Sequence, residues 1–126
     1  MKIKVAVVDD SITTTLVVKK ILTTNGFEVV GTFTDPAAFV ESFMKDLDVD
    51  ITIIDIIMPG MNGIEAIRKV RAFDENAKFI VLSSLGESYK ETAAALEAGA
   101  LDILSKPVNE QILVRALNRA LGINQG

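Results

Sequence analysis

Short apolar runs rich in β-branched residues alternate along the chain with longer segments that have helical spacing. The five runs are Ile3–Val8, Glu28–Phe33, Asp50–Ile54, Lys78–Leu82 and Leu101–Leu104. The first, third and fourth runs are almost continuously hydrophobic, which is typical of strands buried on both faces of a parallel sheet. The pattern therefore predicts five strands.

The segments between and after these runs predict five helices. They span about Ile12–Thr24, Pro36–Lys45, Gly63–Phe73, Ser88–Ala98 and Glu110–Leu121. Ser11 and Asp35 fit as N-caps of the first two helices, and Pro36 suits a first helical position. Asn25-Gly26, Gly99 and Gly122 stand where the first, fourth and fifth helices should end.

Because strand and helix alternate without a break, the sequence predicts right-handed β-α-β crossovers and an α/β fold, a parallel sheet with helices on both faces. In the first helix, Ile12, Leu16, Ile21 and Leu22 are expected to lie along one face. Residues 1–123 should form one domain, and residues 124–126 should be a frayed tail.

Composition narrows the chemistry. The chain has 126 residues and neither cysteine nor histidine, which excludes disulfides, thiolate or Ser-His catalysis and histidine metal ligands. Its net charge of -4 argues against a nucleic-acid-binding surface. No apolar stretch approaches the roughly 20 residues that span a bilayer. We therefore expect a cytoplasmic protein without a membrane anchor, consistent with the absence of cysteine.

Polar residues follow the predicted strands at the edge where a parallel α/β sheet binds ligands. Asp9-Asp10 follows the first strand, Asp55 the third, Ser83-Ser84 the fourth and Ser105-Lys106-Pro107 the fifth. Taken singly, each is also explained as a helix cap, a turn residue or a surface charge. Together, three carboxylates at one edge repel each other unless a cation neutralises them, and carboxylates are ligands that Mg²⁺ favours.

Asp55 stands between an apolar strand and the turn formed by Pro59-Gly60. A carboxylate at such a partly dehydrated edge can act as a nucleophile. A bound metal would neutralise an incoming phosphoryl group, and Lys106 and Ser83 could contact its oxygens. Phosphoryl transfer needs mainly positioning and charge neutralisation, so this set of residues indicates that chemistry.

The sequence resembles the response-regulator receiver domains of two-component signalling over essentially its full length. The matching segments are Val7-Val8-Asp9-Asp10-Ser11, Asp55-Ile56-Ile57-Met58-Pro59-Gly60-Met61-Asn62-Gly63, Ser83-Ser84, Ala98-Gly99-Ala100 and Lys106-Pro107. The resemblance implies a doubly wound, flavodoxin-like sheet with the strand order 2-1-3-4-5. It also implies a signalling phosphoacceptor rather than an enzyme.

By this resemblance, Asp55 is the phosphoacceptor. Asp9 and Asp10, with Asp55 and the backbone carbonyl of Ile57, would hold Mg²⁺. Ser83 matches the hydroxyl that follows the phosphoryl group, and Lys106 the lysine that pairs with it. Lys106-Pro107 would be a cis peptide. The donor would be the phosphohistidine of a histidine kinase.

Further features of the sequence concern how phosphorylation would be transmitted to a target protein. Ile103 stands where many receivers carry an aromatic residue that rotates on activation, which puts an aromatic switch in doubt. The Asp-Asp-Ser start and Ser83-Ser84-Leu85 are similar to chemotaxis receivers, so the target could be a flagellar motor protein or another chemotaxis protein. Signalling would use the face of the fourth helix, fifth strand and fifth helix. We expect a monomer, with dimerisation on phosphorylation left open.

Several alternatives remain open. Met1 and a tail that ends soon after the last helix favour a stand-alone protein, but a fragment of a longer regulator with a transcriptional or enzymatic effector is the other reading. A degenerate receiver that serves only as a binding module is a third alternative. An enzyme of the haloacid-dehalogenase type would need a second carboxylate where Ile57 stands, and a dinucleotide-binding module would need a glycine-rich turn after the first strand.

Overall fold

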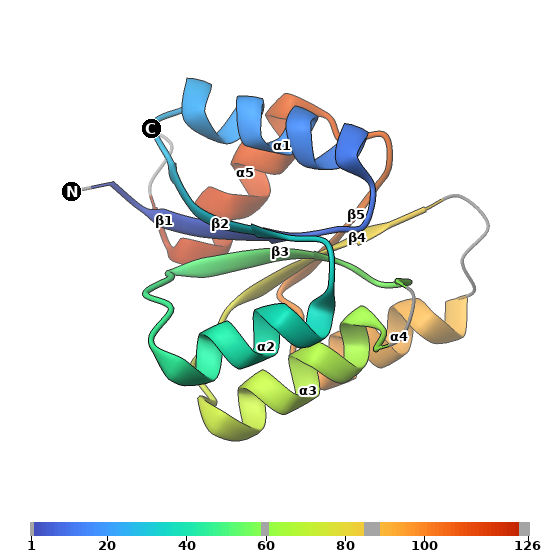
Figure 1. The fold of residues 1–126 in the computed structure, drawn as a ribbon. Helices are drawn as coiled ribbons and strands as arrows, with labels where there is room; N and C mark the ends of the chain where they lie inside the picture. Colours follow the sequence, from blue (N-terminus) through green and yellow to red (C-terminus); the bar gives the residue numbers. More distant parts are fainter. Residues whose placement is uncertain (1, 59–60, 85–88, 124–126) are drawn as a thin grey trace.

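The computed structural model describes residues 2–58, 61–84 and 89–123, and within them it forms a five-stranded parallel sheet with the order β2-β1-β3-β4-β5. The strands are β1 (Lys4–Val8), β2 (Glu28–Phe33), β3 (Ile51–Asp55), β4 (Phe79–Ser83) and β5 (Asp102–Ser105). Helices α1 and α5 cover one face of the sheet and α2, α3 and α4 cover the other (Figure 1). The predicted doubly wound α/β fold and its strand order are confirmed.

The helices are α1 (Ile12–Thr24), α2 (Pro36–Lys45), α3 (Gly63–Phe73), α4 (Tyr89–Ala98) and α5 (Glu110–Leu121). Four of them have the predicted bounds. The predicted start of the fourth, Ser88, lies outside the described residues, as does the predicted tail 124–126. The caps explain this agreement: Ser11 accepts a hydrogen bond from Thr14 N, and Asp35 accepts one from Ala37 N, as N-cap side chains do.

Three strands end one residue later than the hydrophobic pattern predicted. Asp55 belongs to β3, where it is paired in register with Leu82 of β4, and Ser83 of β4 is paired with Ser105 of β5. A strand ends where backbone pairing with its neighbour ends, whereas the pattern ends at the first polar side chain. Asp55 and Ser83 of the predicted site are therefore held inside the sheet, at the ends of their strands.

Two apolar clusters fill the layers on either side of the sheet. Alternate residues of β1 divide between them, since Ala6 and Val8 face α2–α4 while Val5 and Val7 face α1 and α5. The strands buried on both faces are those predicted from their continuous hydrophobicity, and every residue of β3 is buried, including Asp55.

The predicted apolar face of α1 is wrong. Ile12 and Leu16 are 70% and 62% exposed, while Val18, Ile21 and Leu22 are buried. Ile21 lies nine positions after Ile12, which is about 2.5 helical turns, so the two side chains point to opposite sides of the helix. The spacing of Val18, Ile21 and Leu22 (i, i+3, i+4) marks the true core face.

We expect Leu16→Ala to lower the free energy of unfolding by less than about 1 kcal/mol, because most of the side chain is already in water. Val18→Ala, on the buried face of the same helix, should cost about 2 kcal/mol. Urea denaturation of both variants measures the difference. Equal losses would show that Leu16 packs in solution more closely than its exposure indicates.

Among the described residues, no helix combines the length and the apolar character that crossing a membrane requires.

Candidate functional site

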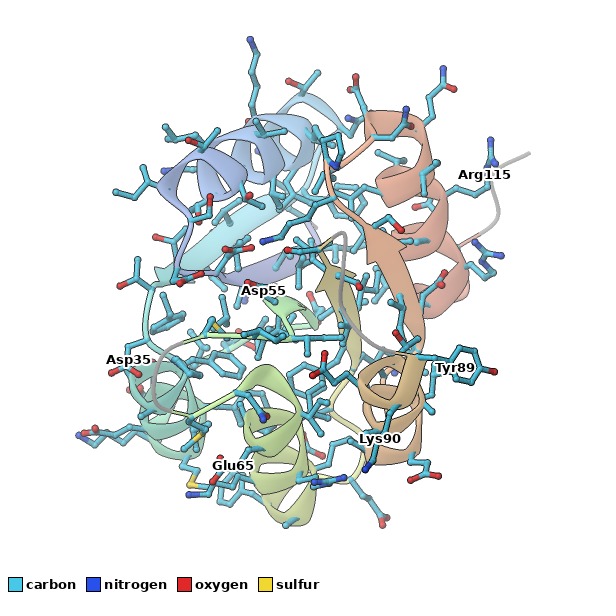
Figure 2. All side chains as sticks on the ribbon, turned by 90° about the vertical axis from the view of Figure 1, so that its right-hand side faces the viewer. Asp35, Asp55, Glu65, Tyr89, Lys90 and Arg115 are labelled. Carbon is cyan, nitrogen blue, oxygen red and sulfur yellow. The ribbon has the colours of Figure 1, made fainter. Side chains whose placement is uncertain are left out.

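Three carboxylates meet at the carboxyl edge of the sheet. One oxygen each of Asp9, Asp10 and Asp55 lies within 4.8 Å of the other two. Asp9 directly follows β1 and Asp55 ends β3, and these strands are neighbours in register, with Val8 beside Ile54. Asp9 and Asp55 are buried, whereas Asp10 is exposed. Figure 2 looks onto this edge, where Asp55 lies near the centre between the two layers of helices.

Lys106 supplies the positive charge of this cluster. Its Nζ lies 2.9 Å from Asp9 Oδ2 and 3.3 Å from Asp55 Oδ2. The backbone N–H of Lys106 donates to the carbonyl of Ser83 at 2.8 Å, which fixes the end of β5 to the end of β4. The Lys106-Pro107 peptide is cis, as the family resemblance implied.

The protonation state of Lys106 follows from these contacts. Burial alone would lower its pKa, but the hydrogen bond to Asp9 and the negative charges of Asp55 and Asp9 outweigh it, and the pKa is raised. The ammonium group therefore stays charged throughout the neutral range. One positive charge still faces three carboxylates, so the cluster carries an excess of negative charge.

A divalent cation would match this cluster. The donor set consists of carboxylate oxygens alone, which hard cations such as Mg²⁺ prefer. Buried like charges held this close raise the free energy of the folded state unless a cation offsets them. The residues present therefore fit the metal that the family resemblance implied.

The structure also places the other predicted residues. Ser83 ends β4, half-buried, one position beyond the residue paired with Asp55. The side chain of Ile57 is exposed beside the site. Ile103 lies half-buried in β5 and packs against the cluster under α2–α4. Pro59, Gly60 and Leu85 lie outside the described residues.

Sequence reasoning missed two backbone contacts that shape the site. The N–H of Ser11 donates to Asp9 Oδ1 at 2.8 Å. The N–H of Gly63 donates to the carbonyl of Ile56 at 2.6 Å, and a Cβ at position 63 would lie only 2.0 Å from the carbonyl oxygen of Asp55. The Asp-x-Ser spacing at a strand-to-helix junction was the available signal for the first contact. For the contact between Gly63 and Ile56, the only signal was a glycine at the start of a helix, which is a weak one.

Comparison with known proteins gives a consistent result. The family model described as the response regulator receiver domain matches residues 5–118. The chemotaxis protein CheY of Thermotoga maritima is 40% identical over 116 residues, which cover 92% of this chain and 95% of that protein. The chemotaxis protein CheY of Bacillus subtilis is 34% identical over 118 residues, covering 94% and 97%.

Solved structures are similar over the same extent. The complex of CheX and CheY with BeF3 and Mg²⁺ from Borrelia burgdorferi matches with a TM-score of 0.86 and 30% identity, covering 93% of this chain and 87% of that one. The response regulator domain of Thermotoga maritima CheB matches with a TM-score of 0.86 and 31% identity, covering 98% and 99%.

Proposed function

The chain belongs to the response regulator receiver domain family of two-component signalling, and from that membership we propose that Asp55 accepts a phosphoryl group from the phosphohistidine of a sensor kinase. The observation that carries the proposal is the buried carboxylate of Asp55, which shares one lysine with Asp9 and lies beside Asp10. The protein acts as a signalling module whose chemistry is confined to its own phosphorylation and dephosphorylation.

In the transfer step, a carboxylate oxygen of Asp55 attacks phosphorus and forms an acyl phosphate. The P–N bond of the donor breaks, and its electron pair returns to the donor imidazole. Asp55 starts 3.3 Å from Lys106 Nζ, so the ammonium group can follow the new negative charge onto a phosphoryl oxygen. Ser83, half-buried at the end of the next strand, supplies a hydroxyl on the same edge.

Mg²⁺, when bound, neutralises the charge that builds up on the transferring oxygens. Asp9, Asp10, Asp55 and the backbone carbonyl of Ile57 would hold it. The buried position of Asp9 and Asp55 keeps bulk water from the two carboxylates that also face Lys106.

The phosphorylated protein transmits the signal by docking to a partner protein. The similarity to CheY proteins supports a chemotaxis target such as a flagellar motor component. The partner face would be formed by α4, β5 and α5, where the labelled side chains of Tyr89, Lys90 and Arg115 point outward, away from Asp55 (Figure 2). Ile103 takes the place of the usual aromatic residue, so phosphorylation would shift populations without an aromatic rotation at that position.

Incubation with acetyl phosphate and Mg²⁺ tests the proposal. We expect intact-mass spectrometry to detect the addition of one phosphoryl group to the wild-type chain, and none when EDTA removes the metal. The reason is that the uncompensated carboxylates repel an anionic donor. An unmodified wild-type chain would instead favour a degenerate receiver that works only by binding.

A further inference from the structure

The acidic pair is oriented by the residue that follows it. We infer that Ser11 is a positioning residue for metal binding: its hydrogen bonds fix the turn that directs Asp10 toward Asp55. The inference rests on the metal site of the proposed function and adds to it a residue that acts through Asp10 instead of binding the metal itself.

Four hydrogen bonds meet at Ser11. Its backbone N–H donates to Asp9 Oδ1 at 2.8 Å. Its hydroxyl oxygen accepts from Thr14 N at 3.2 Å, as the N-cap of α1. Its carbonyl accepts from both Thr15 N and Thr15 Oγ1 at 3.0 Å. Ser11 therefore joins the end of β1 to the first turn of α1.

The neighbour on the other side of Asp10 is also held. Asp9 N donates to the carbonyl of Phe33 at 2.9 Å, and Asp9 Oδ2 lies 2.9 Å from Lys106 Nζ. In the part of the chain that the structure describes, the Asp10 side chain itself makes no hydrogen bond or ion pair. The direction of its carboxylate is therefore set by the backbone between Asp9 and Ser11.

Packing does little to hold the first turns of α1. Ile12 is 70% exposed and Leu16 is 62% exposed, and the first buried side chain of the helix is that of Val18. In α5, by contrast, Leu113 is buried in the first turn. The start of α1 consequently depends on its cap hydrogen bonds, and loss of the Ser11 hydroxyl would let the turn that carries Asp10 fray.

Three variants of the full chain test this. Ser11→Ala removes the cap, Ser11→Thr restores a hydroxyl that can cap, and Asn109→Ala removes the equivalent cap of α5, where Asn109 Oδ1 accepts from Ile112 N at 3.0 Å. NMR titration with Mg²⁺ alone gives the dissociation constant of each, and thermal unfolding without metal gives the loss of stability.

We expect Ser11→Ala to raise the dissociation constant for Mg²⁺ about fivefold. This is the ratio of dissociation constants that corresponds to the free energy typically lost when an N-cap side chain is removed. Ser11→Thr should bind like the wild type. Asn109→Ala should lose comparable stability and keep its affinity. Unchanged affinity in Ser11→Ala, or an equal loss in Asn109→Ala, overturns this inference alone. A wild-type chain that binds no Mg²⁺ overturns the proposed metal site and this inference with it.

Discussion

Asp55→Asn is expected to abolish phosphorylation by acetyl phosphate and Mg²⁺ while the fold stays intact. An amide has the shape of the carboxylate, but its single oxygen is uncharged and is a poor nucleophile. The substitution also removes one of three clustered carboxylates, two of which, Asp9 and Asp55, contact Lys106. Without metal, the free energy of unfolding should therefore stay the same or rise, because repulsion within the cluster falls. Intact mass and urea denaturation measure the two effects.

Asp35→Asn is the matched control. Asp35 caps α2 through a hydrogen bond from Ala37 N, and Asn caps helices equally well, so neither the fold nor the site should change. This variant should be phosphorylated like the wild type. Detection of a phosphoryl group on Asp55→Asn, at any residue, would refute the assignment of Asp55 as the acceptor.

Much of the fold could be predicted because its determinants are local. The caps at Ser11 and Asp35 and the alternation of apolar runs gave four helices with their observed bounds and all five strands. The face of α1 could not be read from which residues are apolar, because Ile12 and Leu16 are apolar and exposed. Only the angular spacing of Val18, Ile21 and Leu22 shows which side meets the sheet.

The sequence predicts which residues form the site but not which of them contact one another. Parallel strands bring their carboxyl ends to one edge, so the meeting of Asp9, Asp10, Asp55 and Lys106 follows from topology. Whether Lys106 pairs with Asp9 or with Asp55 depends on side-chain geometry across three strands, and the structure shows that it contacts both. Backbone contacts such as that between Gly63 and Ile56 leave almost no trace in the sequence.

Gly63→Ala is expected to lower the free energy of unfolding by more than about 3 kcal/mol, at the upper end of overpacking losses. The added Cβ would lie 2.0 Å from Asp55 O and 3.1 Å from Ile56 Cα, which are buried backbone atoms of the last residue of β3 and of the residue that follows it. Neither atom can move without shifting Asp55. Phosphorylation should slow about 100-fold, the cost of displacing a reacting group by 1 Å.

Gly31→Ala separates this effect from the general cost of replacing a glycine. Its added Cβ would lie 2.9 Å from the ring of Phe33, which is a half-buried side chain and not backbone, so we expect a loss of less than about 1 kcal/mol and normal phosphorylation. Urea denaturation and the rate of labelling by acetyl phosphate measure both variants. If Gly63→Ala were as stable and as readily labelled as Gly31→Ala, the start of α3 could move without displacing Asp55. The close contact of Gly63 with the end of β3 would then not be what holds the phosphoacceptor in place.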